Sequence, residues 1–322
     1  MNHYSIMMNA FWTALGEQAR VLWIVLLICA TGGLPGPAAA ESGDGPQKPS
    51  RIIRLVCISD TMPGVDTEDA RMAMEMLMRN VWGDEGREFR IQLDFVDFGQ
   101  IAQKIVSERH DMAILPAMDY LQIRDRVPLI PRLVLSRVNE PTEALVMVTR
   151  RDETFETLSK KDSRILMIDM GRVGEGARMW LDTVLAEAHL GTSQQFFSEI
   201  RRSPKTSRSI LPVFFGQAAA CVVPESALMV MKELNPQIGR RLRVIRRSES
   251  LAALLLCATP WADQGDIDLV VSSSNQAMND PKSQQALTMV QMNRFFRFEP
   301  AYLAATENLY KRFVARIKRG NR

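Results

Sequence analysis

The sequence predicts an α/β fold of two lobes joined by two crossing strands. Short apolar runs typical of strands alternate with stretches in which apolar residues recur every three or four positions, as on one face of a helix. This alternation occurs over residues 51–125 and again over residues 164–234. Strand-like segments at 143–152 and 241–250 lead from the first set to the second and back. Each set is therefore predicted to form a mostly parallel sheet flanked by helices, with right-handed crossovers.

Residues 1–40 are expected to be a cleaved signal peptide. The apolar run at 21–33 follows a basic residue, and it is shorter than the ~20 residues needed to span a bilayer. Ala38 and Ala40 fit the small-residue pattern of a secretory cleavage site. We therefore expect cleavage after Ala40, a periplasmic product and a flexible linker at 41–50, which is rich in glycine, proline and serine. An uncleaved membrane anchor is the alternative.

The first set of elements begins directly after this linker. Strands are predicted at 51–59, 89–96 and 111–116, and helices at 67–82, 100–108 and 117–125. One face of the helix at 67–82 is apolar and carries Ala70, Ala73, Met74, Leu77, Met78 and Val81. Thr67 and Glu68 suit the start of that helix, since polar and acidic residues stabilise a helix N-terminus.

The second set follows the crossing segment at 143–152. Strands are predicted at 164–169 and 219–224, and helices at 175–188, 207–215 and 225–234. The chain then returns through the segments 241–250 and 251–259 and ends in a helix whose apolar residues lie between Leu303 and Ile317. The first lobe is accordingly predicted to comprise residues 51–147 and 243–322, and the second lobe residues 148–242.

Composition argues against several classes of partner and site. The net charge of +3 is too small to imply a polyanionic partner, and the basic run at 240–247 lacks the interleaved aromatic residues that stack on nucleic-acid bases. Cys57, Cys221 and Cys257 each lie inside an apolar run and lack metal-site spacing. We expect them to be buried free thiols, and we expect no nucleic-acid partner.

Motifs for catalysis or metal binding are not found in the sequence. His110 and His189 lack the spacing of a metal-binding HExxH helix, and no GxSxG or CxxC motif occurs. Asp94 and Asp97 are interpreted as exposed strand positions rather than a catalytic pair. We therefore expect a protein that is not an enzyme and has no resident metal or cofactor.

Three segments carry a family resemblance: "HDMAILPAMDYL" from His110, the stretch at 144–190, and "SILPVFFGQAAACVVPESAL" from Ser209. Over residues 51–313 the chain resembles type 2 periplasmic solute-binding proteins, in particular the phosphate/phosphite/phosphonate branch of ABC transporters. The resemblance implies two hinged lobes that capture a small solute and deliver it to a membrane permease. We expect the protein to be a monomer. A sensing module of the same fold that reports to a membrane receptor or sensor kinase is the alternative.

Candidate ligand-binding residues follow the predicted strands, because α/β sheets bind ligands at the carboxyl ends of their strands. Thr61 and Met62 follow the first strand, and Asp119 and Tyr120 begin the helix after the third. Tyr120 matches the ligand-facing tyrosine of the family that the chain resembles. Glu225 follows the strand at 219–224. The alternatives are turn formation for Thr61, packing for Tyr120 and stabilisation of a helix start for Glu225.

The loop "GRVGEG" at 171–176 stands where phosphonate binders carry a hydroxyl-rich run, and it has no hydroxyl. Its glycines, Gly174 and Gly176 among them, allow the backbone N–H groups to form an anion-binding nest. Arg172 could supply the positive charge that attracts an anion in place of the missing hydroxyls. The alternatives are an ordinary tight turn for the loop and a solvated loop residue for Arg172. Glu175 either points away and stabilises the helix start or meets a positive group of the ligand. Thr206 stands near the position of a histidine in the family.

Overall fold

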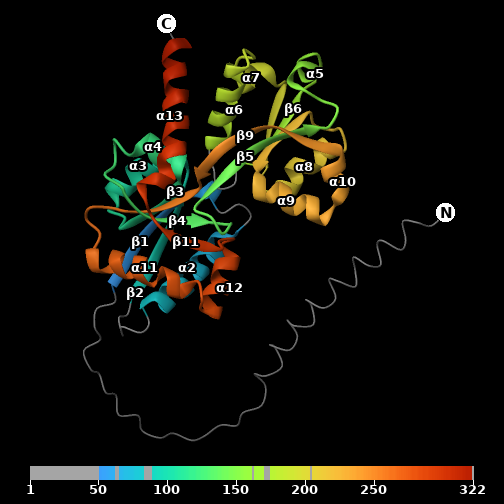
Figure 1. Cartoon of the computed structure of the whole chain (residues 1–322). Helices are drawn as coiled ribbons and strands as arrows, with labels where there is room; N and C mark the ends of the chain where they lie inside the picture. Colours follow the sequence, from blue (N-terminus) through green and yellow to red (C-terminus); the bar gives the residue numbers. More distant parts are fainter. Residues whose placement is uncertain are drawn as a thin grey trace, which may run out of the picture. The chain divides into compact units, whose positions relative to one another are not determined.

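The computed structural model describes residues 51–61, 65–82, 89–161, 163–169, 175–203 and 205–320. The predicted signal peptide and linker lie outside these residues. The described chain folds into two β-sheets flanked by helices (Figure 1), which confirms the α/β prediction. We call the six-stranded sheet with its helices the first lobe and the five-stranded sheet with its helices the second lobe.

The first lobe has the strand order β11-β4-β10-β3-β1-β2. Its strands are β1 (Arg51–Ile58), β2 (Phe89–Val96), β3 (Met112–Pro116), β4 (Ile130–Ser136), β10 (Leu254–Ala258) and β11 (Arg294–Arg297). Its helices are the short η1 (Ser59–Thr61), α2 (Thr67–Trp82), α3 (Phe98–Ser107), α4 (Ala117–Ile123), α11 (Gln264–Ala277), α12 (Pro281–Met289) and α13 (Pro300–Gly320).

The second lobe has the strand order β7-β6-β8-β5-β9. Its strands are β5 (Thr142–Arg150), β6 (Ile165–Asp169), β7 (Glu199–Ser203), β8 (Ala220–Pro224) and β9 (Leu242–Ala252). Its helices are α5 (Phe155–Ser159), α6 (Gly176–Glu187), α7 (Ser193–Phe196), α8 (Thr206–Phe214), α9 (Glu225–Leu234) and α10 (Pro236–Arg241).

Both sheets are mixed rather than mostly parallel, which corrects the sequence prediction. In the first lobe β1 pairs in parallel with β2 and β3, and in the second β6 pairs in parallel with β7 and β8. The remaining strands, β4, β5, β9, β10 and β11, make antiparallel pairs. Each lobe thus has a three-stranded parallel unit extended by antiparallel strands.

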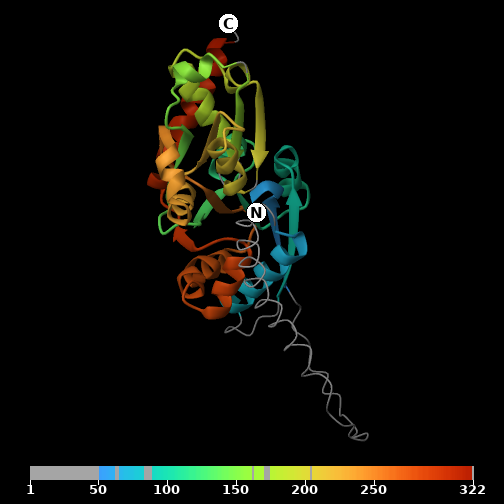
Figure 2. The same cartoon turned by 90° about the vertical axis from the view of Figure 1, so that its right-hand side faces the viewer.

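Helices cover both faces of each sheet. In the first lobe α2 packs against α11 and α12, as Figures 1 and 2 show. The predicted apolar face of α2 is buried there, including Met74 and Leu77. The opposite face of this sheet shares one buried cluster with α6 of the second lobe, and α13 contributes Leu303, Leu309 and Phe313 to it. The helix α13 thereby connects the cores of the two lobes.

The chain crosses between the sheets twice, before β5 and after β9. Both strands pair along their length with each other in the five-stranded sheet, and they lie side by side in Figure 1. The chain therefore changes sheets at 137–141 and at Ala253, and the lobe boundary predicted after residue 147 falls inside β5.

The cysteine prediction is confirmed, since Cys57, Cys221 and Cys257 are free and buried. Burial raises the pKa of all three thiols far above the ordinary value, so they are unreactive at neutral pH. Among the helices in the described part of the chain, none is both long enough and apolar enough for a membrane span.

Candidate functional site

The carboxyl ends of β6, β7 and β8 lie at one edge of the second lobe, because parallel neighbours end at the same edge of a sheet. Asp169 is the last residue of β6 and is buried. The hydroxyl of Thr206, the first residue of α8, donates a hydrogen bond to its carboxylate. The predicted residue Thr206 therefore lies at this edge and is bonded to an acid that the sequence analysis did not select.

Glu175 precedes the first turn of α6, and its carboxylate pairs with two arginines. Its Oε2 lies 2.6 Å from Nε of Arg178, and its Oε1 lies 3.2 Å from Nη2 of Arg202. The side chain makes no capping hydrogen bond, so it does not cap the helix. Gly176 follows as a buried residue of α6. The charge of Glu175 is thus balanced within the second lobe, by residues from α6 and β7.

Glu225 is the first residue of α9 and is also paired. Nε of Arg247, on β9, lies 2.9 Å from both of its carboxylate oxygens, and Nη2 lies 2.7 Å from Oε2. These hydrogen bonds lower the pKa of Glu225 below its ordinary value. The next residue, Ser226, donates from its main-chain N–H and its hydroxyl to Glu143, on β5. The start of α9 is therefore held by both crossing strands.

Three predicted residues of the first lobe are buried in this conformation. The hydroxyl of Thr61 donates to the main-chain oxygen of Ile58 over 2.7 Å. Gln122 donates to Asp119 over 3.2 Å. Tyr120 packs in the cluster shared with α13, and burial raises its pKa. Ligand binding by Thr61, Asp119 and Tyr120 stays a prediction. Met62, Arg172 and Gly174 lie outside the described residues.

Arg137 is a candidate site residue that the sequence analysis did not select. It lies between β4 and β5, where the chain first crosses, and its guanidinium donates to the side chain of Gln291. Its Nε is buried and has no hydrogen-bond partner among the described residues. Burial lowers the pKa of Arg137, while the negative charges of Asp169 and Glu143 oppose this shift. A partly buried cation therefore lies within electrostatic range of two carboxylates from the second lobe.

No local pattern in the sequence distinguishes Arg137, because the strand before it was not predicted. Asp169 could have been selected from the sequence, since it is the last residue of the predicted strand "RILMID" and carboxyl ends of such strands bind ligands. The arrangement as a whole joins a cation from the crossing segment with carboxylates and a hydroxyl from the second lobe. Such a set of groups suits recognition of a small charged molecule. It lacks any nucleophile paired with a histidine base among the residues described.

Comparison with known proteins decides the family. Residues 61–302 match the family model described as "ABC transporter, phosphonate, periplasmic substrate-binding protein". The chain belongs to this family. As a periplasmic substrate-binding component of an ABC uptake system, it works with a small-molecule ligand and a membrane permease. No curated protein sequence matches the chain.

Solved structures of several binding proteins share the fold. A Xanthomonas citri protein bound to ATP has 13% identity and a TM-score of 0.62, over 83% of this chain and 98% of that one. The binding protein of a Pseudomonas aeruginosa phosphonate transporter has 12% identity and a TM-score of 0.59, over 81% and 85%. PhnD1 from Prochlorococcus marinus, in complex with methylphosphonate, has 14% identity and a TM-score of 0.58, over 81% and 97%. These likenesses confirm the two-lobed fold.

Proposed function

We propose that this binding protein is a non-catalytic monomer that captures a small phosphonate between its lobes, with Arg137 as the main contact to the phosphonate oxygens. The observation that carries the proposal is the buried Nε of Arg137, which has no acceptor among the described residues. A guanidinium presents a rigid fork of donors that matches an oxyanion. The family description and the methylphosphonate held by the Prochlorococcus protein support this ligand class.

The carboxylates near Arg137 favour a phosphonate that also carries an amino group. Asp169 and Glu143 both act electrostatically on Arg137, and they would repel a simple anion that approaches it. An ammonium group on the same ligand replaces this repulsion by attraction. The loop at 171–176 offers no hydroxyl donors to compensate. A zwitterionic phosphonate therefore fits the charges of this site better than inorganic phosphate does.

The first prediction concerns ligand preference. In titration calorimetry we expect 2-aminoethylphosphonate to bind at least about tenfold more tightly than methylphosphonate or inorganic phosphate, a difference of about 1.4 kcal/mol. Small-angle scattering should show a smaller radius of gyration with this ligand, because contacts from both lobes favour the closed state. Equal affinity for methylphosphonate would contradict the role of the carboxylates. Binding without compaction would contradict capture between the lobes.

The second prediction concerns export. We infer that the leader is removed after Ala40, since Ala38 and Ala40 form a small-residue cleavage pattern. N-terminal sequencing of the protein from the periplasmic fraction should begin at or near Glu41. Recovery of membrane-bound protein that still begins at Met1 would instead support the anchor.

A further inference from the structure

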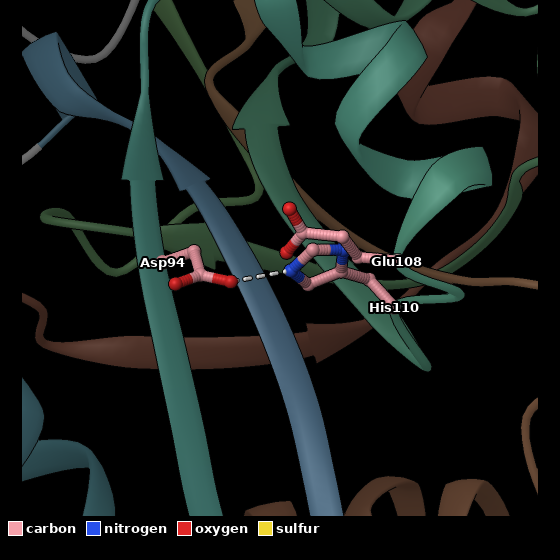
Figure 3. A group of neighbouring side chains, drawn as sticks. All are labelled: Asp94, Glu108 and His110. Atoms are coloured by element: carbon pink, nitrogen blue, oxygen red, sulfur yellow. Dashed lines mark hydrogen bonds and ion pairs between the residues drawn. The ribbon is translucent and has the colours of Figure 1, made fainter.

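Asp94, Glu108 and His110 come together on the first lobe, although none of them belongs to the ligand site described above. One ligand atom from each, two carboxylate oxygens and an imidazole nitrogen, lies within 4.8 Å of the others. Figure 3 shows Asp94 reaching from β2 towards His110, with Glu108 beside the imidazole. We propose that these three residues form a binding site for a divalent metal ion of the zinc type.

The hydrogen-bond partners of the His110 imidazole favour a cation at this site. Its Nδ1 lies 3.2 Å from the main-chain oxygen of Lys104, and its Nε2 lies 2.8 Å from Oδ2 of Asp94. A carbonyl and an ionised carboxylate are both acceptors, whereas a neutral imidazole carries only one N–H. When Nδ1–H donates to Lys104, the lone pair of Nε2 faces Asp94. A cation between them satisfies both groups.

The same geometry is the usual setting of a metal-binding histidine. Such a residue donates its other ring N–H to a carboxylate or a backbone carbonyl, which fixes the tautomer and the orientation of the ring. His110 does this through the oxygen of Lys104, and its side chain is fully buried. Its own main-chain oxygen accepts hydrogen bonds from Thr259 and Trp261. The nitrogen ligand is therefore held in place before any metal arrives.

The two carboxylates are held less tightly, which leaves room for adjustment. Glu108 directly follows α3, and the turn through Arg109, with φ of 51°, returns the chain to His110. The side chains of Asp94 and Glu108 are 25% and 39% exposed. Ligands at zinc–ligand distances of about 2.0–2.1 Å lie about 3.3 Å apart in a tetrahedron. The separation of Asp94 Oδ2 and His110 Nε2, now 2.8 Å, must therefore widen by about 0.5 Å, and the carboxylate must turn off the axis of the imidazole lone pair so that the metal ion can take that position.

The ligand set defines the class of metal. One imidazole and two carboxylates suit zinc and its neighbours among the transition metals, whereas magnesium and calcium prefer oxygen ligands alone. Three protein ligands leave a fourth position for water. The site is independent of the proposed phosphonate capture, because none of its residues takes part in that binding.

The ammonium group of Lys104 competes with a metal ion for the carboxylate of Glu108. Its Nζ lies 2.6 Å from Oε1 of Glu108, so a metal ion must displace the ammonium group from that carboxylate. The hydrogen bond to His110 comes from the main chain of Lys104, and a change of its side chain leaves that bond in place. The substitution Lys104→Met therefore removes the competing charge without removing the acceptor that orients His110.

The test is a calorimetric titration of the tag-free, exported protein with Zn²⁺ alone. The visible absorption spectrum of the protein with Co²⁺ is a second measurement. We expect one ion per chain and visible Co²⁺ bands of a four- or five-coordinate site. Asp94→Asn should weaken Zn²⁺ binding at least about tenfold, because even the loss of an outer partner of a metal ligand costs that much. Lys104→Met should tighten it severalfold.

His189→Asn is the matched control, since His189 is the other histidine after the predicted cleavage site and asparagine tolerates its φ of 58°. This variant should bind Zn²⁺ as the unchanged protein does. Absence of Zn²⁺ binding, or equal binding by Asp94→Asn when circular dichroism shows it folded, would overturn the proposal.

Discussion

Replacing Asp182 by alanine is expected to lower the free energy of unfolding by about 3–5 kcal/mol, the range for breaking a buried ion pair. Asp182 lies on α6, and its side chain is 5% exposed. Its Oδ1 accepts a hydrogen bond from the main-chain N–H of Ser193 over 2.7 Å. Its Oδ2 lies 3.1 Å from Nη1 of Arg178 and 3.7 Å from Nη2 of Arg316. The alanine variant leaves two cations and one buried N–H without this carboxylate.

The loss matters because Arg316 belongs to α13, which joins the cores of both lobes. Arg316 also donates to the main-chain oxygen of Asp182 over 2.6 Å, and this bond survives the substitution. The loss of stability in Asp182→Ala therefore reports on the carboxylate alone. Urea unfolding followed by circular dichroism should show a lower midpoint at an unchanged slope, since the surface exposed on unfolding stays the same.

Glu187→Ala is the matched control on the same helix. Glu187 lies 3.3 Å from Arg312 of α13, but the two side chains are 60% and 50% exposed. Exposed pairs contribute up to about 1 kcal/mol, so this variant should be nearly neutral. Asp182→Asn should fall between the two, because its amide oxygen still accepts from Ser193. A cost for Asp182→Ala no greater than that for Glu187→Ala would show that the buried pair adds no stability.

Elements with strong local patterns were predictable from the sequence. The helix predicted at 67–82 is found at Thr67–Trp82, and the strand predicted at 89–96 is found at Phe89–Val96. In both, the spacing of apolar residues matches the face that the fold buries. The order of alternating strands and helices then restricts the topology, because crossovers between parallel strands are right-handed.

Elements that depend on distant partners were not predicted. The strand β7 reads "EIRRS" and β11 reads "RFFR", both short, largely charged edge strands. They exist because β6 and β4 offer them hydrogen bonds, which no local pattern reveals. The helix α11 contains the polar run "SSSNQ", which weakens its apolar periodicity. The mixed character of the sheets follows from the same long-range pairings.

The candidate site was predictable only as a set of strand ends. Glu225 was selected because the strand at 219–224 ends just before it, whereas Thr206 was selected only from the family resemblance, since the strand before it was not predicted. Their actual partners, Asp169 and Arg247, come from other elements. The same holds for Arg202, which balances Glu175 from β7. Partners separated by tens of residues in sequence meet only after the sheet has formed.

Replacing Arg137 by methionine is expected to weaken binding of the preferred phosphonate by about 2–5 kcal/mol, the range for losing one partner of a buried charge pair. This corresponds to about 30-fold to several thousand-fold in affinity. Methionine retains much of the length of the side chain but none of its charge or donors. Titration calorimetry with 2-aminoethylphosphonate measures the loss, and circular dichroism establishes that the variant is folded.

Arg132→Met is the control for this prediction, since Arg132 lies on the neighbouring strand β4 and also has a buried Nε without a partner among the described residues. Its guanidinium pairs with Asp268 of α11, 3.7 Å away, and not with the carboxylates of the second lobe. The affinity of this variant for 2-aminoethylphosphonate should therefore stay within about twofold of that of the unchanged protein, which corresponds to less than about 0.5 kcal/mol. Equal losses in both variants would mean that Arg137 acts through the fold, and an unchanged affinity in Arg137→Met would exclude it as the contact to the phosphonate.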